Sequence, residues 1–185
     1  QWVTRRWARI ICRILGARLE VDGALPPGPA FLITNHVSYM DPILLAGCIK
    51  RPMRFVMWYR IFQIPLLRFF FQHMQAIPIA GRMEDEQVMH EAFERVDEEL
   101  AAGNVVCIFP EGGITRDGDI HRFRPGIEKI IARRPVPVVP VALGRLWGSW
   151  FSRRKGGGLR TMPGRLFQRV TVRVGEPGSP IRRGT

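Results

Sequence analysis

One octapeptide holds the residues best suited to chemistry. Asn35-His36-Val37-Ser38-Tyr39-Met40-Asp41-Pro42 sets an imidazole and a carboxylate five positions apart. On a straight strand, five steps would carry Asp41 roughly 16 Å from His36 and onto the opposite face. In an unbroken helix, Asp41 would be turned about 140° away. The two side chains can therefore meet only if the backbone bends between them.

The flanking residues predict such a bend. Residues 31–34 are apolar and β-prone, whereas Pro42 and the apolar residues after it predict a helix with proline in its first turn. At this bend Asp41 could accept a hydrogen bond from one ring nitrogen of His36, fix its tautomer and leave the other nitrogen as a proton acceptor. Such a pair would act as a general base. The structural alternative is that Asp41 is a helix N-cap and His36 has no catalytic role.

A second candidate stretch closes another apolar run: Phe109-Pro110-Glu111-Gly112-Gly113. The two glycines would let backbone N–H groups approach a ligand closely. Glu111 could accept hydrogen bonds from substrate hydroxyls, orient a neighbouring group, or simply serve a turn. The loop that follows carries positive charge suited to a phosphate, on Arg116, Arg122 and Arg124.

Strand-like and helix-like runs alternate along the chain. Strands are expected at 17–21, 30–34, 53–57, 75–79, 105–109, 136–143 and 169–174, and helices at 41–49, 61–73, 84–102 and 125–133. Several strands are apolar on both faces, which is typical of a sheet covered on each side. We therefore expect a single α/β domain with a mixed, partly parallel sheet of about seven strands flanked by helices. Both candidate stretches follow strands, where such sheets bind ligands.

Residues 1–16 are expected to form a basic amphipathic helix ahead of a domain at 17–185. Val3, Trp7, Ile10, Ile11 and Ile14 recur at helical spacing, with arginines largely between them. The helix could lie on lipid headgroups or cover the domain core, because periodicity does not distinguish lipid from protein.

Composition limits the function further. The 185 residues are 46% hydrophobic and carry a net charge of +12 with five tryptophans, which favours an anionic membrane surface over nucleic acid. No apolar run reaches the roughly 18 residues of a membrane span, so we expect peripheral attachment to a membrane. Residues 149–166 predict a basic loop. The scattered Cys12, Cys48 and Cys107 indicate neither disulfides nor a zinc site.

Residues 61–73 are unusually apolar for a single helix, which would be either a core helix or a wall of an acyl-chain channel. In the second case Phe70 would influence chain-length preference. We expect His73, His90 and His121 to lack a partner comparable to Asp41 and to be structural or surface residues.

Four blocks in order resemble a known family. Asn35-His36 with Asp41, followed by the block at 109–112, is similar to the motifs of the glycerolipid acyltransferases, which include the 1-acylglycerol-3-phosphate acyltransferases. Residues 76–82 resemble the second block of that family and residues 136–142 the fourth.

The resemblance implies a glycerol-3-phosphate acyltransferase-like fold and a reaction at the cytoplasmic face of a membrane. An acyl group would pass from acyl-CoA or acyl carrier protein to the free hydroxyl of lysophosphatidic acid or lysophosphatidylethanolamine, without a metal or other cofactor. The family's general base corresponds to His36 and its supporting carboxylate to Asp41. The acceptor-binding residues would be Glu111, Gly112, Gly113, Arg82 and Arg116.

Two blocks depart from the family pattern. The second block places Ala80-Gly81 before Arg82, and in the third block three residues separate Gly112 from Arg116. The longer third block resembles acyltransferase domains fused to a transporter or an acyl-carrier-protein synthetase. Such domains are associated with lysophosphatidylethanolamine as the acceptor, so the resemblance leaves both lysophospholipids open, and it implies further domains in the full-length protein.

Three other interpretations start from the same residues. A lipid ester or thioester hydrolase would need a nucleophile, but none of the four serines lies in a G-x-S-x-G turn. A basic nucleic-acid-binding module is suggested by charge alone. A metal site formed by His36, Asp41 and Glu111 is also conceivable.

Overall fold

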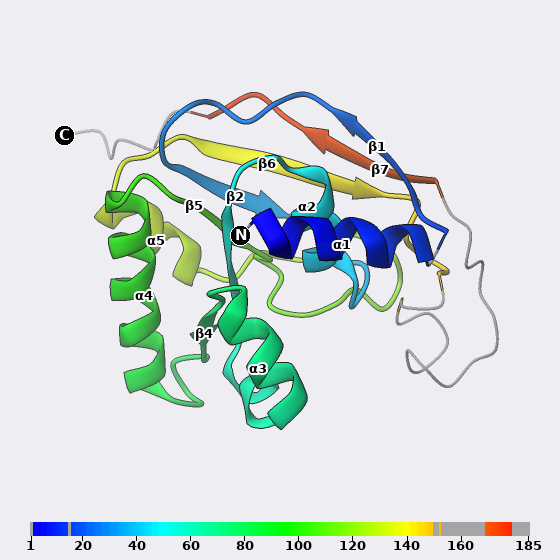
Figure 1. Ribbon diagram of the computed structural model, residues 1–185. Coiled ribbons are helices and arrows are strands. Elements are labelled where there is room, and N and C mark those ends of the chain that lie inside the picture. Colours follow the sequence, from blue (N-terminus) through cyan, green and yellow to red (C-terminus); the bar gives the residue numbers. More distant parts are fainter. Residues whose placement is uncertain (1, 15, 150–151, 153–168, 179–185) are drawn as a thin grey trace.

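A seven-stranded sheet runs through the molecule, and helices cover both of its faces (Figure 1). The structure is a computed structural model that describes residues 2–14, 16–149, 152 and 169–178. Most of the basic loop expected at 149–166 lies outside the described residues. In chain order the elements are α1 (Trp2–Ile14), β1 (Arg18–Asp22), β2 (Ala30–Thr34), α2 (Asp41–Cys48), β3 (Met53–Trp58), η1 (Tyr59–Gln63), α3 (Pro65–His73), β4 (Ile77–Ile79), α4 (Glu86–Ala101), β5 (Val105–Ile108), α5 (Gly126–Arg133), β6 (Val138–Gly144) and β7 (Arg169–Val174).

The sheet is mixed and mostly parallel, which confirms the expected fold class. Its strand order is β1-β7-β6-β2-β5-β3-β4. Strands β6, β2, β5, β3 and β4 pair in parallel, whereas β7 is antiparallel to β6 and carries β1 along its other edge. Because β2 lies between β5 and β6, the loops that leave these three parallel strands emerge together at one edge of the sheet.

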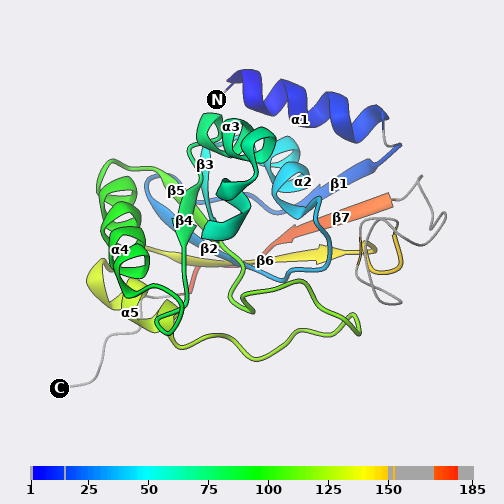
Figure 2. The same ribbon diagram turned by 90° about the horizontal axis from the view of Figure 1, so that it is seen from below.

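The two faces of the central strands enter separate apolar cores. In β2, Leu32 belongs to the core beneath α1, α2 and α3, whereas Phe31 belongs to the core beneath α4 and α5. In β5, Cys107 belongs to the first of these cores and Val106 to the second. Figure 2 shows the two groups of helices on opposite sides of the sheet. This arrangement explains why the central strands are apolar on both faces.

The expected helix at 61–73 is broken, which corrects the prediction of one continuous helix. The 3-10 helix η1 ends at Gln63, Ile64 is extended with φ −85° and ψ 115°, and α3 starts at Pro65. The break follows from Pro65, because a proline ring disfavours helical backbone in the residue before it. None of the described α3 side chains is fully buried, so α3 is not an ordinary core helix.

The clearest predicted helix, at 84–102, is present as α4. The Asp85 side chain caps its start by accepting a hydrogen bond from the Val88 N–H at 3.0 Å. Of the residues that mark the expected inner face, Phe93 and Leu100 are buried, while Val88 is only half-buried. The helix ends before Gly103, whose φ of 82° is the left-handed conformation that glycine adopts readily.

Helix α1 packs on α2 through small residues and leaves its large apolar residues outside. Ala8 and Cys12 are buried, and Ala8 lies against Gly47 of α2. Trp7 and Ile14, by contrast, are 59% and 76% exposed, and Ile10 is also exposed. Close packing of helices requires small residues at the contact, so the bulky face of α1 points away from the domain. Every helix among the described residues is too short or too polar to span a bilayer.

Candidate active site

The site begins where β2 ends, and an amide side chain fixes that end to the neighbouring strand. Asn35 Nδ2 donates to the Leu143 carbonyl at 3.0 Å, and the Leu143 N–H donates to Asn35 Oδ1 at 2.7 Å. The pairing of β2 with β6 ends at Thr34, and the Asn35 side chain extends it by bonding to the backbone of β6. The next residue, His36, leaves the sheet from a defined position.

His36 and Asp41 meet, as the bend between them predicted. His36 Nδ1 lies 2.8 Å from Asp41 Oδ2, and a carboxylate oxygen in that position requires the proton on Nδ1. The ring stacks on Phe109, with ring centroids 4.1 Å apart and an interplanar angle of 26°. The side chain is 18% exposed. Among the described residues nothing hydrogen-bonds Nε2, so this nitrogen is free to accept a proton.

Asp41 is held by the turn before it. Its Oδ2 also accepts hydrogen bonds from the N–H groups of Val37 and Ser38, at 2.8 and 2.9 Å. Met40 is the N-cap of α2, and Asp41 is its first residue. The alternative of Asp41 as an N-cap is therefore wrong, because its carboxylate points back to N–H groups that precede the helix.

The Asp41 side chain has no exposed surface. Burial raises its pKa, while the hydrogen bond and charge of His36 and the N–H groups of Ser38 and Val37 oppose that shift. Its second oxygen, Oδ1, is buried and has no hydrogen-bond partner among the described residues. The carboxylate therefore interacts with its surroundings almost entirely through one oxygen.

Glu111 connects two loops through both of its carboxylate oxygens. Oε1 accepts a hydrogen bond from the His36 N–H at 2.9 Å, and Oε2 accepts one from the His121 N–H at 3.0 Å. The His36 carbonyl in turn accepts a hydrogen bond from the Thr115 N–H at 2.8 Å. The N–H and the carbonyl of His36 are thus both hydrogen-bonded to the loop after β5. Of the roles considered for Glu111, this geometry matches the orientation of a neighbouring group.

The rest of that loop is cross-linked by polar side chains. Thr115 is buried, and its hydroxyl donates to Asp117 Oδ1 at 2.8 Å. This hydrogen bond is the main reason that the pKa of Asp117 is lowered. His121 Nε2 lies 3.1 Å from the same carboxylate, with both side chains about half exposed. His121 is a surface residue as expected, although it does have a carboxylate partner.

Gly112 lies beneath an arginine side chain. Its φ is 69°, and a Cβ on it would collide with the Nε, Cδ and Cζ atoms of Arg124. Gly113 faces open space. Arg82 is 72% exposed, lies in the turn before α4 and is 3.6 Å from Glu86, the first residue of that helix, and Arg116 is exposed. Of the three arginines in the loop after β5, Arg124 is the one that packs on the glycine turn.

The described residues contain no cluster of three or more His, Cys, Asp or Glu side chains that could hold a metal ion. The conceivable site of His36, Asp41 and Glu111 does not form because Glu111 directs both oxygens at backbone N–H groups.

Comparison with known proteins identifies the family. The family model described as Acyltransferase matches residues 18–144, a span that contains every residue described above as part of the site. The chain belongs to the Acyltransferase family. It is also 30% identical over 145 residues to a chloroplastic 1-acyl-sn-glycerol-3-phosphate acyltransferase of Arabidopsis thaliana, covering 77% of this chain and 40% of that protein.

Two further matches extend the comparison. A lyso-ornithine lipid O-acyltransferase of Pseudomonas aeruginosa is 28% identical over 143 residues, covering 77% of this chain and 54% of that protein. The crystal structure of the 1-acyl-sn-glycerophosphate acyltransferase of Thermotoga maritima shares the fold, with a TM-score of 0.70 and 19% identity over 98% of this chain and 70% of that one. The chain thus spans about half or less of the length of these curated relatives. These names do not favour the hydrolase and nucleic-acid interpretations.

Several contacts of this acyltransferase-family site were not anticipated from the sequence. The pairing of Asn35 with Leu143, the stacking of His36 on Phe109 and the position of Arg124 join residues far apart in the chain. For the first, the only signal was that an asparagine after a strand can bond to backbone groups, and this tendency concerns neighbouring residues and does not indicate Leu143. Nothing in the local spacing indicated the other two.

Proposed function

We propose that this chain transfers a fatty acyl group from a thioester, acyl-CoA or acyl carrier protein, to the free hydroxyl of a lysophospholipid. The observation that carries the proposal is the 2.8 Å contact of His36 Nδ1 with the buried Asp41, which leaves Nε2 available. An alcohol is a weak nucleophile at neutral pH, and a positioned base is worth roughly 10²–10⁴-fold in rate. The family match supports the same reaction class.

The proposed step needs no covalent enzyme intermediate. His36 Nε2 accepts the hydroxyl proton of the acceptor as its oxygen attacks the thioester carbonyl. The resulting imidazolium is stabilised by the Asp41 carboxylate. When the tetrahedral adduct collapses, the C–S bond breaks, the new ester remains and the departing thiolate takes the proton from Nε2. We expect no metal or other cofactor to take part.

The loops around His36 have distinct proposed roles. Glu111 positions His36 through its backbone N–H. Gly112 and Gly113 let the backbone approach the acceptor closely. Arg82 and Arg116, both exposed, add positive charge to the loops that would meet an anionic headgroup.

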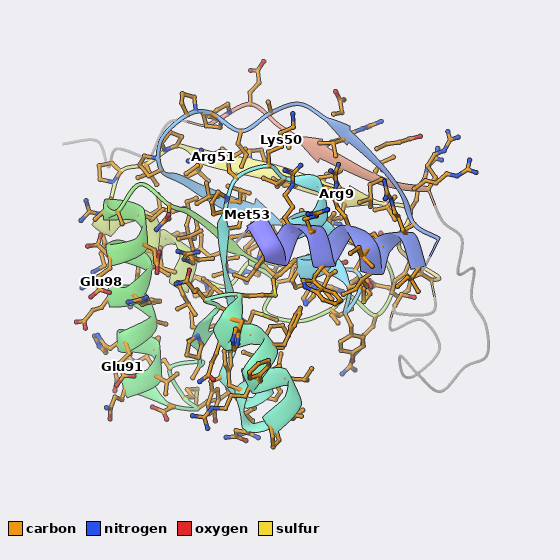
Figure 3. The ribbon with its side chains drawn as sticks, viewed as in Figure 1. Arg9, Lys50, Arg51, Met53, Glu91 and Glu98 are labelled. Carbon is orange, nitrogen blue, oxygen red and sulfur yellow. The ribbon has the colours of Figure 1, made fainter. Side chains whose placement is uncertain are left out.

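We further propose that α1 rests on the cytoplasmic face of an anionic membrane, so that lipid acceptors reach the site from the bilayer. Its exposed Trp7, Ile10 and Ile14 suit the boundary between headgroups and acyl chains. Figure 3 supports this orientation: Arg9 lies on the α1 side with Lys50, whereas Glu91 and Glu98 lie on α4, across the sheet.

Adding charge to the outer face of α1 tests this orientation. The double variant Trp7→Glu/Ile14→Glu should bind vesicles of phosphatidylglycerol and phosphatidylcholine at least tenfold more weakly, since burying each such side chain is worth about 1.5–3 kcal/mol. Vesicle co-sedimentation measures the binding. Gln87→Glu/His90→Glu is the matched control, because both residues are exposed on α4, which lies on the opposite side of the sheet from α1 in Figure 2. Equal losses in both variants would contradict the proposed orientation.

Helix α3 is the proposed wall of the acyl-chain site. Phe70 is half-buried and contacts Phe71 edge-on, with ring centroids 5.4 Å apart. Phe70→Ala should open space and shift relative kcat/KM towards hexadecanoyl over dodecanoyl donors by roughly 10-fold. Phe69→Ala is the control, because Phe69 is 64% exposed. Unchanged selectivity in the Phe70 variant across a donor series would exclude this wall.

Product analysis tests the proposed function itself. The protein is incubated in EDTA with labelled acyl-CoA or acyl carrier protein and a panel of lysolipids: lysophosphatidic acid, lysophosphatidylethanolamine and lyso-ornithine lipid. Mass spectrometry should find a diacyl product from at least one lysophospholipid, with activity unaffected by the chelator. Free fatty acid as the sole product would instead indicate a hydrolase.

A further inference from the structure

Arg124 is held at the site through its backbone although it comes from the far end of the loop. Its backbone N–H donates to the Pro110 carbonyl at 2.9 Å, which ties it to the turn after β5. In the same turn the Gly112 N–H donates to the Phe109 carbonyl at 3.1 Å. The His36 ring stacks on Phe109, which belongs to this turn. The backbone of Arg124 is therefore hydrogen-bonded to the turn that packs against the proposed general base.

The guanidinium of Arg124 lies across two loops. On one side it covers Gly112, where the absence of a Cβ makes room for it. On the other side it approaches Gly81, in the loop after β4, where a Cβ would lie 3.7 Å from Arg124 Nη1. Glu84 belongs to this second loop, and its pKa is lowered mainly by the Gly81 N–H and also by the charges of Arg60 and Arg124.

The donors of this guanidinium have no partner among the described residues. Within the described part of the chain, no hydrogen bond or ion pair involves the Arg124 side chain. An arginine with five N–H donors, exposed and packed against a glycine turn, is suited to bidentate binding of an oxyanion. Arg82, in contrast, lies near Glu86 at 3.6 Å.

We infer that Arg124 binds the headgroup phosphate of the lysophospholipid acceptor, beside the backbone of Gly112. This inference rests on the proposed function. In this arrangement the phosphate lies over the Phe109–Gly112 turn while the free hydroxyl of the glycerol reaches His36 Nε2. Arg124 contributes acceptor binding and no part of the proton transfer.

The test compares Arg124→Gln with Arg133→Gln, which removes the same charge from an exposed position at the end of α5. Arg124→Gln should lower kcat/KM for the phosphate-bearing acceptor roughly 10–100-fold, mainly through the KM for the acceptor. It should leave the KM for acyl-CoA unchanged, and Arg124→Lys should recover part of the loss. Monoacylglycerol, an acceptor without phosphate, serves as the second substrate.

The outcomes separate the two claims. If wild-type protein acylates no lysolipid, the proposed function fails and the inference with it. If wild-type protein is active and Arg124→Gln changes the acceptor KM no more than Arg133→Gln does, the inference alone fails. It also fails if Arg124→Gln reduces acylation of monoacylglycerol as much as acylation of the phosphate acceptor, because such a loss would mean that Arg124 only supports the loop.

Discussion

Replacing His36 with alanine is expected to lower acyl transfer by about 10²–10⁴-fold or more, the contribution of a positioned general base. The reason is that no other described imidazole lies beside a fully buried carboxylate: His121 is paired with Asp117 at the surface, where both side chains are about half exposed. Initial rates with a lysophospholipid and acyl-CoA measure the loss, and circular dichroism measures the fold.

Stability needs separate attention in this variant, because alanine leaves the Asp41 charge buried without its partner. His36→Gln addresses this problem, since its amide can donate to Asp41 but cannot accept the hydroxyl proton. His90→Ala is the matched control, on the exposed surface of α4. Substantial transfer by a folded His36→Gln protein would refute the role of His36 as the base.

Asp41→Asn is expected to be nearly as damaging, with a loss of about 10²–10⁴-fold in kcat. An amide oxygen can still accept the N–H groups of Val37 and Ser38, so the turn should persist. The negative charge that stabilises the protonated His36 is lost. The new NH2 group would also replace Oδ1, which is buried and has no hydrogen-bond partner among the described residues, and an NH2 group left unpaired there would cost about 1–3 kcal/mol in unfolding free energy.

Because Asp41 is not the N-cap of α2, this test separates catalysis from helix capping. Asp97→Asn is the control for stability: Asp97 accepts two hydrogen bonds from Arg134, at 2.7 and 3.0 Å, away from the site. It should lower the free energy of unfolding while leaving kcat near the wild-type value. An Asp41→Asn protein with wild-type kcat would mean that the carboxylate only shapes the turn.

Much of the fold was predictable because short-range effects decide it. Pro42 marks the start of α2, the capping Asp85 and the glycine at 103 delimit α4, and doubly apolar runs indicate a sheet covered on both faces. The same kind of effect corrected the prediction at 61–73, where the restriction imposed by Pro65 on Ile64 outweighed the apolar character of the run.

The meeting of His36 with Asp41 was also implicit in the sequence. The strand before the pair and the proline after it leave a bend of only a few residues, and a bend of that length brings the two side chains within reach of each other. The pairing of the His36 imidazole with the Asp41 carboxylate is thus a local property of the chain.

Only the tertiary structure decided what surrounds that pair. Glu111 was expected at the site, but its contact with the His36 N–H depends on β5 lying next to β2. The sequence did not distinguish Arg124 from Arg116 and Arg122 as a phosphate-binding candidate. In the structure, the path of the loop places Arg124 against Gly112. The direction of α1 likewise followed from the small residues Ala8 and Cys12 at its contact with the domain. Periodicity and spacing describe a segment alone, whereas these contacts depend on which segments the fold brings side by side.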